Sequence, residues 1–335
     1  MRPERTIVHI LDDFAIGGVT RALKNFEDPR LAQLGQHVAA DMRDGCPKAS
    51  SANDIAIVHF TANWLKLGAL AELKTLGGFS KVILIEHSYT DGFEQSEVRL
   101  QMKFRQLLRA AYFLVDTVVA VSEGQRRWIL EAKLAPARKV VAIPQSRDCS
   151  SLLDISLPDR SGGPLKIGAY GRFHRQKGFD LLIEAMTKVP PAIACLMLAG
   201  TGPEEPALRT KAAPIPHVEF CPPFSTPDRF LARTDVIAIP SRWEAFGLVG
   251  TEARMAGRPI IAAGIDGLTD QLSGQGFRHR CGDVDSLVSA IRSAASAEDF
   301  LRRAGTTRAE AIGEYDRMIG AWQAELSAHE VAAAA

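Results

Sequence analysis

Short apolar runs rich in β-branched and aliphatic residues recur along the chain, and most are separated by segments whose apolar residues follow a helical spacing. Such runs predict strands that are buried on both faces, while segments such as 63–76 and 124–134 predict amphipathic helices. Strands alternating with helices indicate parallel sheets covered on both sides, as in an α/β protein. The strands are predicted at residues 6–11, 37–42, 55–60, 81–87, 117–122, 139–144, 165–171, 194–200, 217–220, 236–241 and 258–263.

A polar, turn-rich segment interrupts this alternation at residues 148–166, where a helix would be due. We interpret it as a linker between two doubly wound domains of similar size, 1–150 and 151–335. The last helix, about 308–330, is a candidate to pack back on the N-terminal domain. Ligands of such sheets bind at the carboxyl edges of the strands, so two domains of this type predict a cleft between those edges.

Composition narrows the class of protein. The 335 residues are 46% hydrophobic and 24% charged with a net charge of +1, which argues against a nucleic-acid partner. The five cysteines are an odd number without a CxxC pair, so we expect neither a disulfide framework nor a zinc site. No apolar run approaches the roughly 20 residues of a spanning helix, and the N-terminal run is too short for a signal peptide. We therefore expect a cytoplasmic protein.

Two glutamates stand close together in the stretch IPSRWEAFGLVGTEARMAG, residues 239–257. We expect a buried strand to end near Pro240 and a helix to run from Gly247 to Gly257. Glu244 then lies in the loop at the helix mouth and Glu252 about one turn inside. The free amides of the first turn suit a phosphate, and Glu252 could accept hydrogen bonds from neighbouring hydroxyls. The alternative is that both glutamates only decorate a helix N-terminus.

Arg172 and Lys177 lie in a glycine-containing loop, GAYGRFHRQKGF, that follows a predicted strand and opens a helix. Two cations aimed at one cleft would hold a diphosphate and neutralise the charge that builds as it departs. The alternative is a pair of solvated surface charges. Neither GxxxxGK[ST] nor a GxGxxG after a first strand is present, which disfavours ATPases and ordinary dehydrogenases.

Acidic pairs at two other places raise the question of a metal. Asp283 and Asp285 form a DxD sequence, but a clear helical pattern follows them, so we interpret Asp283 as a helix N-cap. Asp12 and Asp13 end the first strand without a third ligand at a useful spacing. We therefore predict no required metal.

His87 ends the strand at 81–87, where it could meet a ligand held by the other domain. A lone histidine is more often a structural residue, and that alternative stays open. Ser88, Tyr89 and Ser122 at neighbouring strand ends could line the same wall.

A basic helix with an apolar stripe is predicted at residues 97–115. On a helical wheel Leu100, Phe104, Leu107, Leu108, Ala111 and Leu114 share one side, which can pack on the domain. Cations mixed with outward apolar residues suit peripheral contact with an anionic membrane, and a solvated basic face is the alternative. The candidate contact residues are Arg99, Met102, Lys103, Arg105, Arg109 and Phe113.

Taken together, the motifs resemble those of glycosyltransferase family 4. The resemblance spans nearly the whole chain, and the paired-glutamate motif at 244–260 is its most specific part. It implies a GT-B fold, which has two facing Rossmann-like domains and a deep cleft between them. The other matching segments are Gly17 and Gly18, VVAVSEG at 118–124, GRFHRQKG at 171–178 and LAGTGP at 198–203.

The resemblance also implies roles for single residues. Arg172 and Lys177 would hold the diphosphate, Glu252 the ribose hydroxyls, and His87 would lie near the anomeric carbon. Glu244 with the backbone of 246–249 would bind sugar hydroxyls and phosphates. The donor-binding set is Gly17, Gly18, Gly171, Gly200, Gly202, Phe246, Gly247, Leu248, Val249 and Glu252.

Such an enzyme transfers a sugar with retention from a UDP- or GDP-linked donor, so an α-linked product is expected. The acceptor would be a saccharide or lipid-linked saccharide of the cell envelope, and no cofactor is expected beyond the nucleotide-sugar co-substrate. A GT-B nucleotide-sugar epimerase and a non-catalytic nucleotide-sugar-binding relative are the alternatives. The chain departs from the family pattern at Thr20, Gln145, Pro222 and GIDGLTDQL (264–272), which bear on acceptor contacts, hinge, base and sugar pocket. Nothing in the sequence indicates an oligomeric state.

Overall fold

The computed structural model describes residues 5–12, 22–160 and 162–333. Its contacts divide the chain into two compact units. Unit 1 comprises Met1–Thr90, Glu97–Arg147 and Tyr315–Ala335, and unit 2 comprises Asp91–Ser96 and Asp148–Glu314. Each unit is described by itself below.

Unit 1 is built around a parallel sheet in the order β2-β1-β3-β4-β5-β6. All residues of β3, β4 and β5 are buried, as expected for central strands that carry helices on both faces. The edge strand β2 is more exposed and carries His37 and Asp41. The strands are β1 Thr6–Leu11, β2 Gln36–Asp41, β3 Ile55–Val58, β4 Lys81–Glu86, β5 Thr117–Ala120 and β6 Val140–Ala142.

Some helices of unit 1 start at a side chain that caps them. Ser122 accepts a hydrogen bond from the Gln125 amide at the start of α6, and Asp28 accepts one from the Arg30 amide at the start of α2. The helices are η1 Lys24–Glu27, α2 Pro29–Ala32, η2 Met42–Asp44, η3 Trp64–Lys66, α3 Leu67–Leu76, α5 Gln101–Phe113, α6 Glu123–Glu131, η4 Ala137–Lys139 and α14 Glu314–Ala333.

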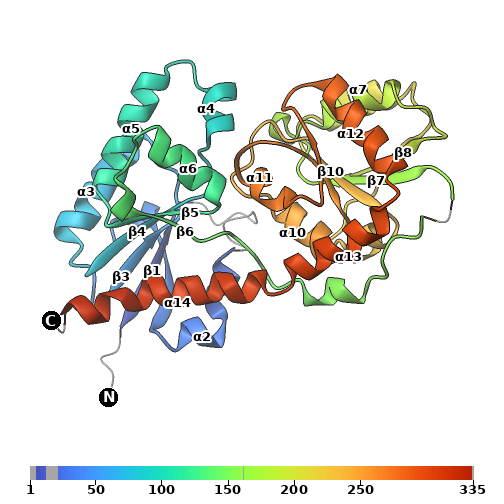
Figure 1. The fold of residues 1–335 in the computed structure, drawn as a ribbon. Coiled ribbons are helices and arrows are strands. Elements are labelled where there is room, and N and C mark those ends of the chain that lie inside the picture. The colour runs from blue at the N-terminus through green and yellow to red at the C-terminus, as the bar shows by residue number, and fades with distance from the viewer. Residues whose placement is uncertain (1–4, 13–21, 161, 334–335) are drawn as a thin grey trace. The chain divides into compact units, whose positions relative to one another are not determined.

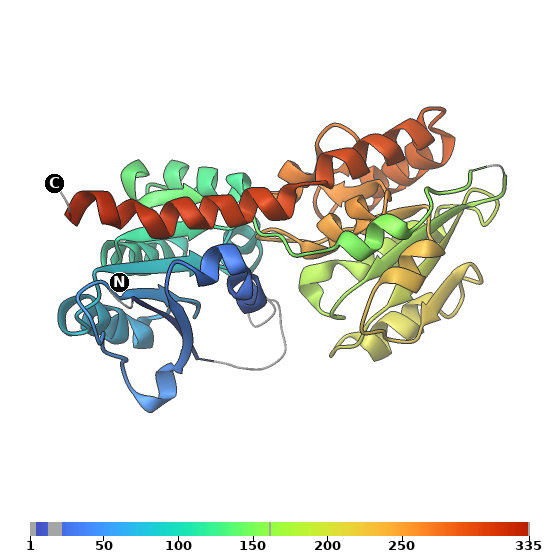
Figure 2. The ribbon, with the colours of Figure 1, turned by 90° about the horizontal axis from the view of Figure 1, so that it is seen from below.

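The C-terminal helix α14 belongs to unit 1 and runs along it, as both ribbon views show (Figures 1 and 2). Its Lys81–Glu325 ion pair (2.6 Å) ties it to β4, and the Trp322 ring meets Phe26 at 5.0 Å between centroids. This packing makes a segment from the end of the chain part of the N-terminal core. The buried residues of its inner side are Met318, Ile319, Trp322 and Leu326.

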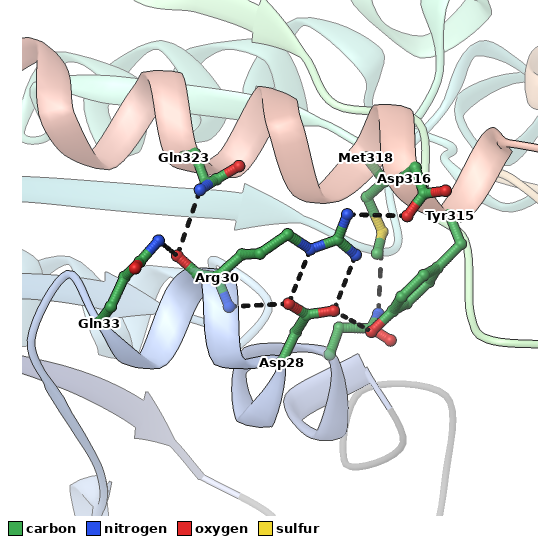
Figure 3. A network of polar contacts seen from close by, with 8 residues as sticks. Asp28, Arg30, Gln33, Tyr315, Asp316, Met318 and Gln323 are labelled. Atoms are coloured by element: carbon green, nitrogen blue, oxygen red, sulfur yellow. Dashed lines mark hydrogen bonds and ion pairs between the residues drawn. The ribbon is translucent and has the colours of Figure 1, made fainter.

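A polar network fixes the start of α14 against α2 (Figure 3). The Arg30 guanidinium bridges Asp28 at 2.9 Å and Asp316 at 2.8 Å. The Tyr315 hydroxyl donates to Asp28 at 3.2 Å, and the Gln323 amide donates to the Arg30 carbonyl at 3.3 Å. Because the arginine donates to two carboxylates, the network orients both chain segments together.

Unit 2 repeats the architecture, with the strand order β12-β11-β10-β7-β8-β9 and all pairs parallel. Its core includes Ile167, Leu196 and Val236 from three strands, packed against helices α7 and α12. The strands are β7 Leu165–Tyr170, β8 Ala194–Ala199, β9 Val218–Cys221, β10 Val236–Ile239, β11 Ile260–Ala263 and β12 Phe277–His279. The helices are α4 Asp91–Glu97, η5 Ser150–Asp154, η6 Arg175–Lys177, α7 Phe179–Thr187, α8 Glu205–Ala212, α9 Asp228–Ala232, α10 Leu248–Met255, α11 Asp266–Leu272, α12 Val284–Ser296 and α13 Phe300–Ala311.

One expectation from the sequence was wrong in detail, and one strand was not predicted. The helix expected at 97–115 is interrupted, because α4 ends at Glu97 and α5 begins only at Gln101. Residues of α4 make their own contacts within unit 2, where the Gly92 amide donates to Asp266 at 3.0 Å. The other miss is β12, whose three residues are too few for a period to be seen.

Candidate functional site

The candidate residues of unit 2 lie in loops that follow three neighbouring strands. β10, β7 and β8 are adjacent and parallel, so their carboxyl ends share one edge of the sheet. The loop at 171–178 follows β7, the loop at 200–203 follows β8, and the loop at 240–247 follows β10. This edge is where ligands of open α/β sheets bind.

Glycines let the loops after β7 and β8 touch each other backbone to backbone. Gly200 has φ +150°, and a Cβ there would lie 1.9 Å from the carbonyl oxygen of Gly171. At Gly202, with φ +155°, a Cβ would lie 2.4 Å from the carbonyl oxygen of Phe173. Both positions therefore exclude larger residues, and packing between the loops is sufficient to explain this requirement.

Lys177 and Glu244 form a partly buried ion pair across the loops after β7 and β10. The Lys177 Nζ lies 2.5 Å from Glu244 Oε2, and the two side chains are 20% and 11% exposed. The Ser241 hydroxyl donates to the same carboxylate oxygen at 3.1 Å, and the Glu244 amide donates to Asp266 at 3.1 Å. An ammonium has three donors, so this contact leaves Lys177 able to donate to a second anion.

Arg172 lies in the loop after β7, which also carries Lys177. It is exposed, and it forms no hydrogen bond or ion pair with any residue that the structure describes. The next arginine differs, because the Arg175 guanidinium lies 5.9 Å from the Trp243 ring centroid. No contact among the described residues therefore gives the charge of Arg172 a role in stabilising the fold.

The helix mouth expected after β10 is present. Gly247 has φ +91° and caps α10, and the helix then ends near Gly257 as predicted. The amides of Leu248 and Val249 belong to the first turn, where a helix offers no internal acceptors. The Gln271 side chain donates to the carbonyl oxygens of Phe246 at 2.5 Å and Gly247 at 2.9 Å, which fixes the turn. No pattern in the sequence indicated this role of Gln271.

Glu252 lies inside α10 and is buried, with 6% of its surface exposed. The Tyr170 hydroxyl at the end of β7 donates to its Oε2 atom. The Tyr170 ring packs against Phe230 and Phe224, with centroids 5.4 and 5.5 Å away. Tyr170 was not among the candidates, because an aromatic residue at a strand end is usually part of the core.

Asp283 has the capping role that the sequence predicted. Its Oδ1 accepts a hydrogen bond from the Ser286 amide at 2.8 Å, at the start of α12. Asp285 instead pairs with Lys188 at 2.7 Å on the surface. In the described part of the chain, no three His, Cys, Asp or Glu residues are grouped so that they could hold a metal ion.

In unit 1, His87 follows β4 and is half-buried. Burial lowers its pKa to about 4, so the ring is neutral near pH 7. The preceding residue shapes this turn, because Glu86 accepts hydrogen bonds from the amides of Ser88 and Tyr89, both at 3.0 Å. The Tyr112 hydroxyl donates to the other Glu86 oxygen at 2.9 Å. Burial raises the pKa of Glu86.

The other residues proposed for this wall have structural partners. The Tyr89 hydroxyl donates to the Ala62 carbonyl at 2.9 Å, and Ser122 caps α6. Asp12, which was considered above only as a possible metal ligand, forms an ion pair with Lys66. Gly17, Gly18 and Asp13 lie outside the described residues.

The basic face of α5 is present, although it is shorter than expected. Met102 and Phe113 are each 78% exposed, and Leu107 and Leu108 on the opposite side are buried. Leu100 was expected to pack in that stripe but is 63% exposed, because it precedes the helix. Arg99 also lies outside the helix, and Lys103 and Arg105 lie on it.

Two cations near the end of α5 have structural tasks. The Arg109 guanidinium donates to the carbonyls of Ala132 and Lys133 just past α6. Lys139 donates to carbonyl oxygens at the end of α5, among them those of Phe113 at 3.0 Å and Val115 at 2.6 Å. Each cation offsets the partial negative charge of a helix C-terminus. Of the helices in the described ranges, none is both long and apolar enough to cross a membrane.

Comparisons with known proteins agree with this architecture. Residues 164–296 match the family model described as glycosyl transferases group 1. Phosphatidyl-myo-inositol mannosyltransferase of Mycobacterium leprae is 31% identical over 242 residues, which cover 66% of this chain and 60% of that protein. D-inositol 3-phosphate glycosyltransferase of Geodermatophilus obscurus is 29% identical over 254 residues, covering 65% and 54%. The chain thus spans less than two thirds of the length of these relatives.

Solved structures share the fold at low sequence identity. HepE from Anabaena, in complex with UDP, gives a TM-score of 0.73 at 17% identity, covering 97% of this chain and 100% of that one. Sucrose-phosphate synthase from Thermosynechococcus elongatus gives 0.71 at 18% identity, covering 98% and 100%.

The two parallel six-stranded α/β units are those of a GT-B protein. The resemblance seen in the sequence is confirmed by the match of residues 164–296, within unit 2, to the group 1 glycosyl transferase model and by the mannosyltransferase relative.

Proposed function

We propose that this protein is a retaining glycosyltransferase that moves a hexose from a nucleotide-diphosphate sugar to a saccharide or lipid-linked saccharide acceptor. The observation that carries the proposal is the grouping on one sheet edge of unit 2. There the Lys177–Glu244 pair, the exposed Arg172 and the first turn of α10 accompany the buried Glu252. Cations and free amides suit phosphates, whereas carboxylates suit hydroxyls. A nucleotide sugar offers both kinds of group.

The leaving diphosphate is the part of the donor that gains charge during transfer. Lys177, Arg172 and the Leu248 and Val249 amides supply positive charge for it, with no metal in the proposed mechanism. Donors held in place before the reaction typically contribute about 10²–10³-fold to a rate. The leaving phosphate then accepts the proton of the attacking hydroxyl on the same face of the sugar, which yields an α-linked product from an α-linked donor.

Glu252 is assigned to the ribose hydroxyls of the donor. Its carboxylate is buried and already accepts a hydrogen bond from Tyr170, so its position is fixed before a ligand arrives. The base is proposed to be uracil or guanine. Uracil is supported by the structures of Anabaena HepE in complex with UDP and with UDP-glucose.

The acceptor is proposed to belong to a cell-envelope glycolipid or polysaccharide. This proposal is supported by two of the relatives, which are named a phosphatidyl-myo-inositol mannosyltransferase and a D-inositol 3-phosphate glycosyltransferase. We further propose that the outer face of α5 rests on an anionic membrane surface. Met102 and Phe113 are exposed on this face. Phe113 also lines a groove of about 590 Å³ together with Arg109, Lys133 and Arg138. The protein would then work at the cytoplasmic side of that membrane.

Proton NMR of the sugar anomeric signals tests the reaction class. The purified protein is incubated with UDP-glucose or GDP-mannose, with and without a saccharide acceptor. Release of free nucleotide diphosphate together with an α-anomeric product is the expected result. Appearance of a second nucleotide sugar would instead indicate the epimerase. A donor that binds and stays unchanged with every acceptor would indicate the non-catalytic relative.

A further inference from the structure

Four histidines form a continuous hydrogen-bonded chain across unit 1. They lie on or directly after four neighbouring strands, in the sheet order β2, β1, β3 and β4. His37 Nδ1 lies 2.9 Å from His9 Nε2, and His9 Nδ1 lies 2.9 Å from His59 Nε2. His59 Nδ1 lies 3.3 Å from Nε2 of His87. The chain therefore ends at His87, which the family resemblance places near the anomeric carbon of the donor sugar.

The outer end of the chain fixes the direction of every bond. His37 Nε2 lies 3.3 Å from the carbonyl oxygen of Leu31, which can only accept, so this nitrogen carries a hydrogen. In a neutral ring the other nitrogen, Nδ1, is then an acceptor, and His9 must donate from Nε2. By the same reasoning Nδ1 of His9 accepts from Nε2 of His59, and Nδ1 of His59 accepts from Nε2 of His87. All four rings are therefore Nε2–H tautomers, and His87 keeps an unprotonated Nδ1.

The surroundings keep the four rings neutral. His9 and His59 are each 3% exposed, and the Phe26 ring packs on His9 with its centroid 4.5 Å away. Burial lowers the pKa of His9 to about 3 and of His87 to about 4, and it also lowers the pKa values of His37 and His59. The positive charge of Arg5 lowers the pKa of His37 further. A carboxylate partner would stabilise a protonated ring, but among the described residues no carboxylate forms a hydrogen bond with any of the four rings.

We propose that His37, His9 and His59 are positioning residues that hold His87 as the Nε2–H tautomer, so that its Nδ1 accepts a hydrogen bond from a substrate hydroxyl. No described residue makes a hydrogen bond with that Nδ1 atom. The inference rests on the proposed function only for the identity of the hydroxyl. The tautomer itself follows from the geometry of unit 1.

The chain also defines what one added proton does. If Nδ1 of His87 takes up a proton from solvent, the Nε2 proton of each ring can move to Nδ1 of the next ring, from His87 through His59 and His9 to His37. The charge then resides on His37, which holds both of its protons, while the other three rings become neutral Nδ1–H tautomers. One proton thus reverses every bond and changes His87 Nδ1 from an acceptor to a donor.

Nitrogen-15 NMR of the histidine rings in the full chain tests the inference without any substrate. The signals are assigned with the variants His87→Asn and His37→Phe. At pH 7 we expect Nε2 of His87 to give a pyrrole-like shift and Nδ1 a pyridine-like shift, with the same pattern in the three other rings. A pyrrole-like Nδ1 on His87, or a charged ring at pH 7, would overturn the proposal. This result is independent of whether the protein transfers a sugar.

A comparison of variants separates tautomer control from simple packing. His37→Phe removes the anchoring donor but keeps a ring beside Phe26, so the His87 Nδ1 shift should move toward the pyrrole-like value. The control is His217→Gln in unit 2, where a lone ring bonds to the Met186 and Val189 carbonyls. It should leave the His87 signals unchanged. An unmoved His87 signal in folded His37→Phe would show that the chain does not set the tautomer. If that variant does not fold, the wild-type spectrum still decides.

Discussion

Replacing Lys177 with methionine should damage the reaction more than the fold. In the folded chain Lys177 neutralises Glu244, and both side chains are partly buried at 20% and 11% exposure. Breaking a fully buried pair costs about 3–5 kcal/mol, whereas a surface pair contributes about 0–1 kcal/mol. Because Ser241 continues to donate to the carboxylate, we expect a loss of about 1–2 kcal/mol. That corresponds to a Tm lower by roughly 2–8 °C.

The expected loss of rate is larger. If Lys177 also stabilises the departing diphosphate, its removal should slow transfer by about 10²–10³-fold, or about 2.7–4 kcal/mol. The assay is nucleotide release from the donor, measured well below the Tm of each variant, alongside calorimetric unfolding. Lys188→Met is the matched control, because Lys188 forms only an exposed pair with Asp285 in the same unit.

The double variant Lys177→Met, Glu244→Gln separates the two effects. It removes the unpaired carboxylate together with the cation, so the Tm should recover most of its loss. The rate should stay low, since the positive charge is still missing. If rate and Tm recovered in parallel, Lys177 would act only through folding, and its assignment to the diphosphate would be refuted.

Three further predictions concern the two units separately. Gly200→Ala should destabilise unit 2 by at least about 2 kcal/mol in denaturant unfolding, because a Cβ there would lie 1.9 Å from a carbonyl oxygen. Gly305→Ala is the control and should not destabilise it, because a Cβ there would have no atom within 4 Å. In the unfolded chain the buried histidines become protonated below about pH 6.5, whereas in the folded chain His9 becomes protonated only near pH 3. Protons therefore favour the unfolded chain, and the Tm should fall steadily from pH 6.5 to 4. A constant Tm over this range would contradict the burial of these histidines. Phe113→Glu should reduce cosedimentation with vesicles of anionic lipid at least several-fold, and Leu301→Glu on unit 2 should not; equal binding by all forms would remove α5 from the proposed membrane contact.

Much of the fold could be read from the sequence because its signals are local. The strand ending near Pro240, the glycine that opens α10 and the cap at Asp283 each depend on residues close together in the chain. The prediction of one helix over 97–115 was wrong at its start, because the chain leaves the helical conformation between Glu97 and Gln101 and the preceding helix α4 contacts Asp266 of unit 2. The strand β12 was missed because three residues carry no period.

The partners within the candidate site could not be read in this way. Tyr170 lies 82 residues before Glu252, and Gln271 lies 25 residues after the Phe246 carbonyl that it orients. The histidine chain depends on the strand order β2-β1-β3-β4, which brings His9 and His59 together across 50 residues. The order of the strands in the sheet cannot be read from a single sequence. The candidate residues were therefore identifiable by type and position, while the side chains that hold them required the structure.

The most direct test of the donor site is calorimetric titration with UDP, GDP and ADP in the presence of EDTA, on the wild type and on two variants. Glu252→Gln keeps the size of the side chain and an acceptor for Tyr170 but removes the charge. Glu298→Gln removes an exposed carboxylate elsewhere in unit 2. We predict that UDP or GDP binds, and that Glu252→Gln weakens it by about 10–100-fold, the equivalent of a charged hydrogen bond, while Glu298→Gln does not. Failure of all three nucleotides to bind, or unchanged affinity in Glu252→Gln, would contradict the account.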